Sequence, residues 1–165
     1  MQALSLRDEL TGLYNRRGFF TLSEQQLKIT DRMKKDAILI FTDLDHLKWI
    51  NDNLGHEEGD RALIASSIIL KETFRESDII ARIGGDEFVV LAIEALEDVF
   101  QFINSRLQEN IDLFNKKNNL KYELSMSIGI AHYAHENPIS LDMLIAHADK
   151  LMYEDKKRKR VGSQQ

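Results

Sequence analysis

Residues 79–93 read IIARIGGDEFVVLAI and predict a β-hairpin. The two arms, residues 79–83 and 88–93, are rich in the β-branched and apolar side chains that favour strands. Residues 84–87 (GGDE) lie between the arms, and glycine adopts the positive φ values that tight hairpin turns require. The stretch therefore predicts two neighbouring antiparallel strands with two acidic side chains at the turn between them.

Two further runs predict strands. Residues 37–42 (AILIFT) form an apolar run that ends at Asp43, which is typical of a strand buried on both faces. Residues 123–130 alternate between large apolar and polar or small side chains, which predicts an antiparallel strand with one covered face. Apolar residues at helical spacing predict four helices, at about 15–35, 57–75, 96–114 and 140–159. The order of these elements predicts an α+β domain with a mainly antiparallel central sheet flanked by helices.

The composition narrows the class of protein. The chain has 165 residues and no Gly/Ser-rich linker, so we expect a single domain over residues 1–165. It has no cysteine, which excludes disulfides and thiolate metal sites. It also lacks a run of about 18 apolar residues and a secretory signal, so we expect a cytoplasmic location and no membrane segment. The net charge of −5 argues against a nucleic-acid partner.

Acidic side chains stand at two predicted strand ends. Asp43 and Asp45 follow the run 37–42, while Asp86 and Glu87 occupy the hairpin turn. Strand ends lie at the rim of a sheet, so carboxylates there can converge on a hard cation. Mg²⁺ is such a cation, and it binds a few carboxylate oxygens together with substrate phosphates. Aspartate is also common in turns, and either pair alone is equally compatible with loop capping.

Residues 48–60 (KWINDNLGHEEGD) offer groups that could bind a nucleotide. Lys48 supplies positive charge for phosphate. Asp60 can accept hydrogen bonds from the N1–H and the exocyclic amine of guanine, and Asn51 can both donate and accept. The same stretch is typical of turns, so these residues by themselves leave both interpretations open.

Five motifs, in order and at matching spacing, make residues 6–160 resemble the GGDEF domain family of diguanylate cyclases. They are residues 8–17 (DELTGLYNRR), 43–60 (DLDHLKWINDNLGHEEGD), 82–88 (RIGGDEF), 127–130 (SIGI) and 148–156 (ADKLMYEDK). The resemblance implies a nucleotidyl-cyclase-like fold with a ferredoxin-like core, in which the GGDEF turn lies on a β-hairpin. It also implies that two GTP molecules are joined into cyclic di-GMP with release of two pyrophosphates.

The resemblance implies a role for each matching residue. Asp43, Asp86 and the backbone carbonyl of Leu44 match the ligands of two Mg²⁺ (or Mn²⁺) ions in each half-site. Asp86 also matches the base that takes the proton from the attacking 3′-hydroxyl. Glu87 matches a second acid needed for activity, and Lys48 a catalytic cation. The implied GTP-binding residues are Lys48, Asn51, Asp60, Gly84, Gly85, Lys156 and Arg160.

The resemblance also implies an assembly and its regulation. One domain binds one GTP, so catalysis implies a homodimer with two-fold symmetry. Arg75 and Asp78 form an RxxD motif at the position of the family's product-inhibition site for cyclic di-GMP, although a charged helix end has the same residues. We expect residues 1–11 to join the domain to an upstream sensory domain and residues 161–165 to be a disordered tail. The chain departs from the family at Lys159, where the family has Gly.

Two other functions remain open. A GGDEF domain without activity could bind GTP or cyclic di-GMP and signal by contact. Such domains usually have a damaged turn, whereas residues 84–87 and Asp43 are intact here. A related cyclase could use another purine, but adenine lacks the N1–H that would donate to Asp60. The basic run 156–160 (KKRKR) is by itself compatible with a solvated helix end.

Overall fold

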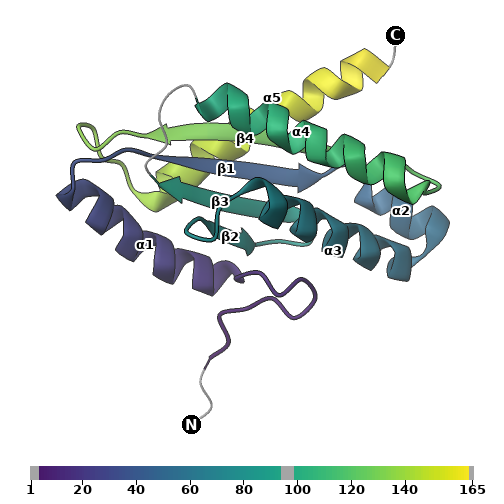
Figure 1. The fold of residues 1–165 in the computed structure, drawn as a ribbon, viewed down its shortest axis with the longest axis horizontal. Coiled ribbons are helices and arrows are strands. Elements are labelled where there is room, and N and C mark those ends of the chain that lie inside the picture. Colours follow the sequence, from purple (N-terminus) through teal and green to yellow (C-terminus); the bar gives the residue numbers. More distant parts are fainter. Residues whose placement is uncertain (1–3, 94–98, 164–165) are drawn as a thin grey trace.

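The computed structural model describes residues 4–93 and 99–163. Within these residues, four strands form one antiparallel sheet in the order β2-β3-β1-β4, and five helices flank it (Figure 1). The elements in chain order are α1 (Arg16–Arg32), β1 (Ala37–Leu44), α2 (Leu47–Leu54), α3 (His56–Thr73), β2 (Ile79–Arg82), β3 (Glu87–Ile93), α4 (Val99–Asn118), β4 (Met126–Tyr133) and α5 (Leu141–Ser163). The structure confirms the predicted α+β domain with an antiparallel sheet.

The strand β1 lies inside the sheet, between β3 and β4. Every residue of β1 is buried, as the apolar run 37–42 predicts. The register places Asp43 opposite Glu87 of β3 on one side and opposite Ser127 of β4 on the other. Strands β2 and β3 form the predicted hairpin. The GGDEF turn, residues 84–87, therefore lies at the same end of the sheet as the last residues of β1.

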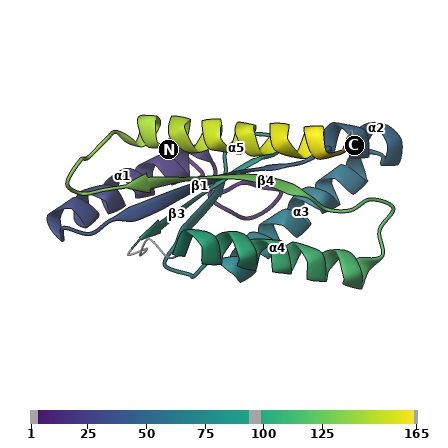
Figure 2. The ribbon, with the colours of Figure 1, turned by 90° about the horizontal axis from the view of Figure 1, so that it is seen from above.

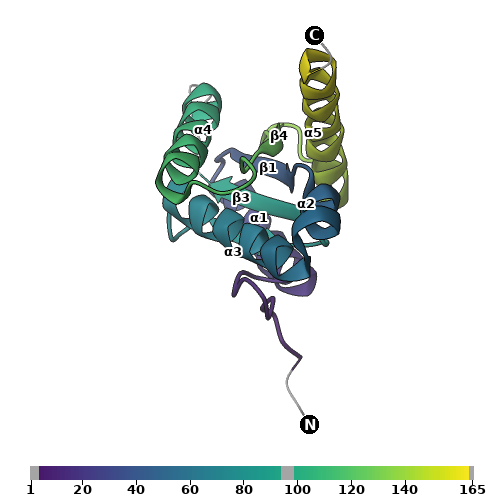
Figure 3. The same cartoon turned by 90° about the vertical axis from the view of Figure 1, so that its right-hand side faces the viewer.

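Helices cover both faces of the sheet. Helices α3 and α4 pack on one face, against Ile38 and Ile40 of β1. Helices α1 and α5 pack on the other face, against Leu39 and Phe41. Figures 2 and 3 show the sheet lying between α4 and α5. Because alternate side chains of β1 enter two separate cores, the strand is apolar on both sides.

The segment after β1 is a helix, although its composition is typical of a turn. Helix α2 contains Leu47, Ile50 and Leu54 at helical spacing, and all three pack against the core. That spacing is the signal for this helix. Gly55, with a φ of 94°, then separates α2 from α3, and glycine adopts a positive φ without strain. Strand β1 also continues through Leu44, beyond its predicted end.

The prediction of one covered face for β4 is wrong, and the strand lies later in the chain than the predicted range 123–130. Helix α5 lies across the face that carries Ser127 and Gly129. A Cβ on Gly129 would collide with the backbone carbonyl oxygen of Ala148 and the backbone nitrogen of Met152. The small side chains on this face therefore permit close helix packing and do not mark a solvent-facing side.

The other helices lie close to the ranges that the apolar spacing predicts. Leu96, the expected first apolar position of the third predicted helix, lies outside the described residues, and α4 begins at Val99. Helix α5 continues through Ser163, into the stretch 161–165 that we expect from the sequence to be disordered. Within residues 4–93 and 99–163, no helix is both long and apolar enough to cross a lipid bilayer.

Candidate active site

The end of β1 meets the GGDEF turn through the backbone. The N–H of Leu44 donates a hydrogen bond to the backbone carbonyl of Asp86, at 3.0 Å. Asp43 lies opposite Glu87 in the strand ladder. This pairing brings Asp43, Leu44 and Asp86 side by side, although they come from two segments of the chain. The three residues that the resemblance implies as metal ligands are therefore neighbours.

Asp43 lies in an environment that disfavours its negative charge. The residue is 8% exposed. Burial, followed by a hydrogen bond with the Asp86 carboxyl and repulsion from it, raises the pKa of Asp43 to about 7. Lys156, whose Nζ lies 3.1 Å from Oδ2 of Asp43, offsets only part of this effect. The other oxygen, Oδ1, is buried, and no donor among the described residues reaches it.

These residues fit a hard divalent cation. Two carboxylates this close repel one another, and a cation bound between them would remove that repulsion. The unpartnered Oδ1 of Asp43 costs free energy unless something binds it. The described part of the chain contains no group of three or more His, Cys, Asp or Glu side chains that could hold a metal ion. The other ligands would therefore be a backbone carbonyl, phosphate oxygens and water, the usual arrangement for Mg²⁺ beside a nucleotide.

Unlike Asp43, Asp45 has hydrogen-bond partners for both of its carboxylate oxygens, although the sequence groups the two residues together. Its carboxylate accepts hydrogen bonds from Oγ of Ser125 (2.8 Å), Oγ of Ser127 (2.6 Å) and Nζ of Lys159 (3.1 Å). Burial alone would raise the pKa of Asp45, but these hydrogen bonds and the lysine charge outweigh it, so the pKa is lowered. The three partners lie 80 to 114 positions further along the chain, so no local pattern identifies them.

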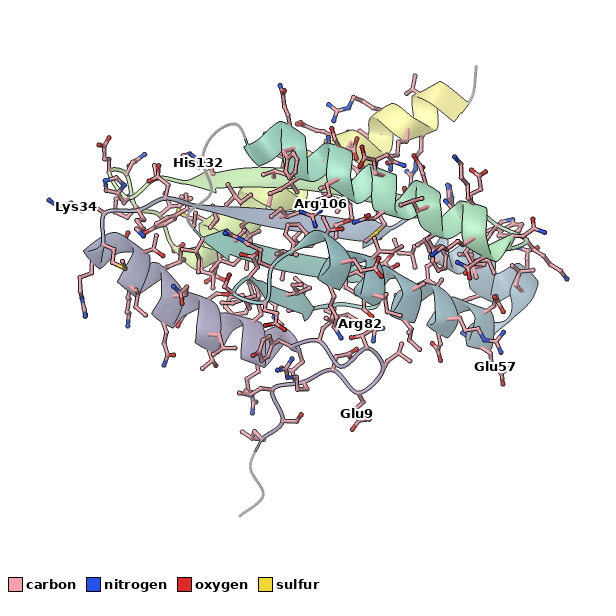
Figure 4. The ribbon with its side chains drawn as sticks, in the orientation of Figure 1. Glu9, Lys34, Glu57, Arg82, Arg106 and His132 are labelled. Carbon is pink, nitrogen blue, oxygen red and sulfur yellow. The ribbon has the colours of Figure 1, made fainter. Side chains whose placement is uncertain are left out.

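Arg82 links the GGDEF turn to Asp8 of the N-terminal segment. The Arg82 guanidinium donates to the backbone carbonyl of Gly85, at 2.8 Å, and pairs with the Asp8 carboxylate, at 3.2 Å. Thr11 donates to the same carboxylate through its backbone N–H and its hydroxyl. Figure 4 shows Arg82 close to the loop that carries Glu9. This link was not predicted, because it joins residues 74 positions apart.

Glu87 is the second acid of the turn. Burial, followed by repulsion from Asp86 and Asp149, raises the pKa of Glu87. A Cβ on Gly84 would lie 2.6 Å from Oε2 of Glu87. The first glycine of the turn therefore leaves room for an acidic side chain of the protein itself, in addition to the room for a nucleotide that the resemblance implies.

Asn51 and Asp60 lie on the two helices joined at Gly55. Asn51 belongs to α2 and is half-buried, and its side-chain oxygen is so close to Gly59 that a Cβ there would collide with it. Asp60 follows Gly59 near the start of α3 and is exposed. The α2–α3 connection therefore places the amide and the carboxylate of the implied guanine pair near one another at the surface.

A pocket of about 630 Å³ lies beside Asp86 and the end of β1. Its lining includes several residues that the sequence predicts for the site: Leu44, Lys48, Asp86, Lys156 and Arg160. It also includes Asp45, which the sequence places with Asp43, and residues to which the sequence assigned no role: Trp49, Gln108 and Lys159. The clustered cations suit an anionic ligand. Asn51 and Asp60 are not among the lining residues, so the pocket brings together implied metal-binding and phosphate-binding residues without the implied guanine pair.

Arg75 and Asp78 line a second pocket of about 570 Å³, together with Arg7, Tyr14 and Lys71. The Asp78 side chain is 4% exposed and accepts a hydrogen bond from the backbone N–H of Arg75, at 2.9 Å. Burial raises the pKa of Asp78, and hydrogen bonds from the backbone of Arg75 and Ile93 offset only part of that. The Arg75 side chain is 66% exposed, and its guanidinium donates to the carbonyl of Ile93. Asp78 thus stabilises the chain after α3, and Arg75 is the accessible member of the pair.

The chain is similar to known proteins over almost its whole length. A family model described as "Diguanylate cyclase, GGDEF domain" matches residues 5–161. The probable diguanylate cyclase DgcC of Escherichia coli (strain K12) is 37% identical over 131 residues, which cover 79% of this chain and 35% of that protein. The cyclic di-GMP phosphodiesterase NbdA of Pseudomonas aeruginosa is 30% identical over 156 residues, which cover 94% of this chain and 20% of that protein.

A solved structure of similar extent is the GGDEF domain of PA1120 from Pseudomonas aeruginosa. It superposes with a TM-score of 0.81 at 30% sequence identity, over 92% of this chain and 89% of that chain. The chain therefore corresponds to one domain of that kind, whereas it spans about a third or less of the curated relatives DgcC and NbdA.

Proposed function

The chain belongs to the GGDEF domain family, and on that premise we propose that it is a diguanylate cyclase domain. It would join two GTP molecules into cyclic di-GMP and release two pyrophosphates. The observation that supports this most directly is the buried Asp43 beside the Asp86 carboxyl, because no group among the described residues bonds to one of the Asp43 oxygens. The cation-lined pocket next to this pair suits a triphosphate.

The proposed reaction is a nucleotidyl transfer between two GTP molecules. The 3′-oxygen of one GTP bonds to the α-phosphorus of the other, the bond from that phosphorus to the bridging oxygen breaks, and pyrophosphate leaves. A second such step closes the ring. Two Mg²⁺ (or Mn²⁺) ions, held by Asp43, Asp86 and the carbonyl of Leu44, would lower the pKa of the 3′-hydroxyl and neutralise the leaving pyrophosphate. Asp86 accepts the proton of that hydroxyl, and Glu87 adds negative charge beside it.

The remaining predicted residues bind the substrate. Asn51 and Asp60 read guanine, because their amide and carboxylate match its donors and acceptors. Three cations, those of Lys48, Lys156 and Arg160, hold the triphosphate, which is how proteins catalyse phosphoryl and nucleotidyl transfer mainly through positioning and charge. Gly84 and Gly85 let the nucleotide approach the turn.

We propose that the active form is a homodimer. Within the described residues, Asp43, Asp86 and the pocket beside them make up one candidate GTP site. The reaction needs two GTP molecules that face one another, so two domains related by a two-fold axis would meet the requirement. Residues 1–11 would then connect the domain to an upstream sensory domain. The ion pair between Asp8 and Arg82 supports that role, because it links this segment to the GGDEF turn. A domain that consumes GTP is expected to work in the cytoplasm.

We also propose that cyclic di-GMP inhibits the enzyme through Arg75 and Asp78. The exposed Arg75 guanidinium suits the edge of a guanine or a phosphate, since it presents a planar fork of donors. The pocket at this position supports the proposal. Asp78 is already bonded to the backbone, so its contact with the product would require that this bonding rearrange. Arg75 is therefore the main expected contact.

The experiment that tests the proposed activity is incubation of the protein with GTP and Mg²⁺, with identification of the product by mass. Wild type should form cyclic di-GMP, and Asp86→Ala should form none while remaining folded. Glu24→Ala, which removes an exposed carboxylate on α1, is the matched control and should stay active. Product formation by Asp86→Ala would contradict the assignment. A folded wild type that binds GTP without forming product would favour the signalling domain without activity.

A further inference from the structure

The last turns of α5 direct three cations toward the candidate active site. Lys156, Lys159 and Arg160 lie on one face of the helix because they are three and four positions apart, and all three line the 630 Å³ pocket. Figure 2 shows this end of α5 at the same end of the domain as α2. Lys156 and Arg160 match phosphate-binding residues of the family, whereas Lys159 stands where the family has Gly. Lys159 therefore requires a separate explanation.

The Lys159 ammonium is bound by the protein itself. Its Nζ lies 3.1 Å from Oδ2 of Asp45 and 3.5 Å from Oγ of Ser125, and it also donates to the backbone carbonyl of Met126. A lysine ammonium has three N–H donors, so these three acceptors can take all of them. Asp45 directly follows β1, Ser125 directly precedes β4, and Met126 is the first residue of β4. Lys159 thus ties α5 to two strands at one point.

Asp45, which accepts a hydrogen bond from Lys159, also makes several hydrogen bonds with residues at or just before the start of β4. Its carboxylate accepts hydrogen bonds from the hydroxyls of Ser125 and Ser127, and its backbone N–H donates to the carbonyl of Ser125, at 2.8 Å. The Asp45 side chain is 5% exposed, whereas the Lys159 side chain is 39% exposed. The buried carboxylate is therefore the rigid partner, and the lysine reaches it from the helix.

We propose that Lys159 is a positioning residue for the phosphate-binding end of α5, an inference that rests on the proposed function. Helix ends fray unless something holds them. The bonds of Lys159 to Asp45 and Met126 hold the last turns of α5 against the sheet, and this keeps Lys156 and Arg160 at the pocket. Direct contact of Lys159 with phosphate accounts for the structure less well, because its donors already have acceptors in the protein.

The test measures binding without turnover. The probe is α,β-methylene-GTP with Mg²⁺, in which the α–β bridge is carbon and cannot be displaced. Trp49 is the sole tryptophan of the chain, lines the pocket and is 50% exposed, so its fluorescence reports binding. Lys159→Met removes the charge but keeps a long side chain. We expect its Kd to rise about threefold to tenfold, with little change in kcat at saturating GTP. Its melting temperature should fall, because the buried Asp45 carboxylate loses one of its partners.

Lys157→Met is the matched control. It makes the same change of charge on the same helix, but the Lys157 ammonium lies over the ring of Tyr153, at 4.8 Å, and does not line the pocket. Its Kd should equal that of wild type. A Lys159→Met protein that also binds as wild type does would overturn the proposal, and an equal loss in both variants would show a general effect of charge.

Asp45→Asn separates positioning from direct contact with phosphate. Positioning predicts that Asp45→Asn weakens binding as Lys159→Met does, and that the double variant is no weaker than the weaker single variant. Direct contact predicts tighter binding in Asp45→Asn, because the released lysine becomes available to phosphate. That result would overturn the proposal. If Asp45→Asn does not melt cooperatively, Ser127→Ala takes its place with the same expectation, since it removes the 2.6 Å hydrogen bond to Asp45. A folded wild type that neither binds the probe nor forms cyclic di-GMP would instead refute the proposed function.

Discussion

Asp43, at the end of β1, lies beside the Asp86 carboxyl of the GGDEF turn. We therefore expect the metal-free protein to be less stable at high pH. Asp43 has a folded-state pKa of about 7, against an ordinary value of 3.8. The unfolded chain therefore loses this proton at a lower pH than the folded chain does. The folded state is penalised progressively from about pH 4 upward, and the full penalty applies above about pH 7. The difference between the two values corresponds to about 4 kcal/mol at most.

Asp43→Asn should remove this penalty, because asparagine keeps the shape of the side chain and carries no charge. Unfolding in EDTA at pH 8 should show the variant more stable than wild type by about 1–4 kcal/mol. For a chain of this size, each kcal/mol corresponds to about 2–4 °C in melting temperature. At pH 5 the advantage should shrink, because Asp43 of wild type is then largely protonated.

The neighbouring Asp45 is a control, because its pKa is shifted in the opposite direction from that of Asp43. Its pKa is lowered by hydrogen bonds that outweigh burial, so its contribution to stability is present above about pH 4 and is lost only as the pH falls further. Asp45→Asn should therefore be less stable than wild type at both pH 8 and pH 5. An Asp43→Asn protein that is less stable than wild type to the same extent at both pH values would refute the reasoning.

Four further outcomes are expected. Mg²⁺ should raise the melting temperature of wild type at pH 8 and leave that of Asp86→Ala unchanged, since a ligand stabilises the state that binds it; an equal rise in both would contradict the cation site. GTP should be used at least about tenfold better than ATP, because unpaired polar groups reject the wrong base, and Asp60→Ala should narrow this preference; comparable use of both nucleotides by wild type would argue against the guanine assignment. Arg75→Ala should keep basal synthesis and lose its sensitivity to added cyclic di-GMP in progress curves; equal sensitivity would leave this RxxD as a charged helix end. Asp8→Ala should lower the free energy of unfolding in urea by about 1–3 kcal/mol, because the mostly buried Arg82 loses its ion pair; unchanged stability would show that this link is not structural.

The strands that the sequence predicted well are those whose pattern is local. The run 37–42 and the hairpin 79–93 are apolar because they enter the core, and their burial agrees with that pattern. Helix α2 was not among the predicted helices, because residues 51–53 are typical of a turn and the helical spacing of Leu47, Ile50 and Leu54 was given less weight. The prediction that one face of β4 is open to solvent was wrong for a different reason. Small side chains are compatible both with solvent exposure and with close helix packing, and only the position of α5 distinguishes the two.

The sequence by itself determined the fold class, the family and the group of acids and cations from which a site is built, because spacing and residue type are local properties. Only the tertiary structure decided which of the two neighbouring aspartates keeps an oxygen without a partner among the described residues. Asp43 meets Asp86 and Lys156, whereas Asp45 is enclosed by Ser125, Ser127 and Lys159. These partners lie far along the chain. The charge state and availability of a carboxyl group depend on the groups that surround it in space, and its neighbours in sequence do not specify them.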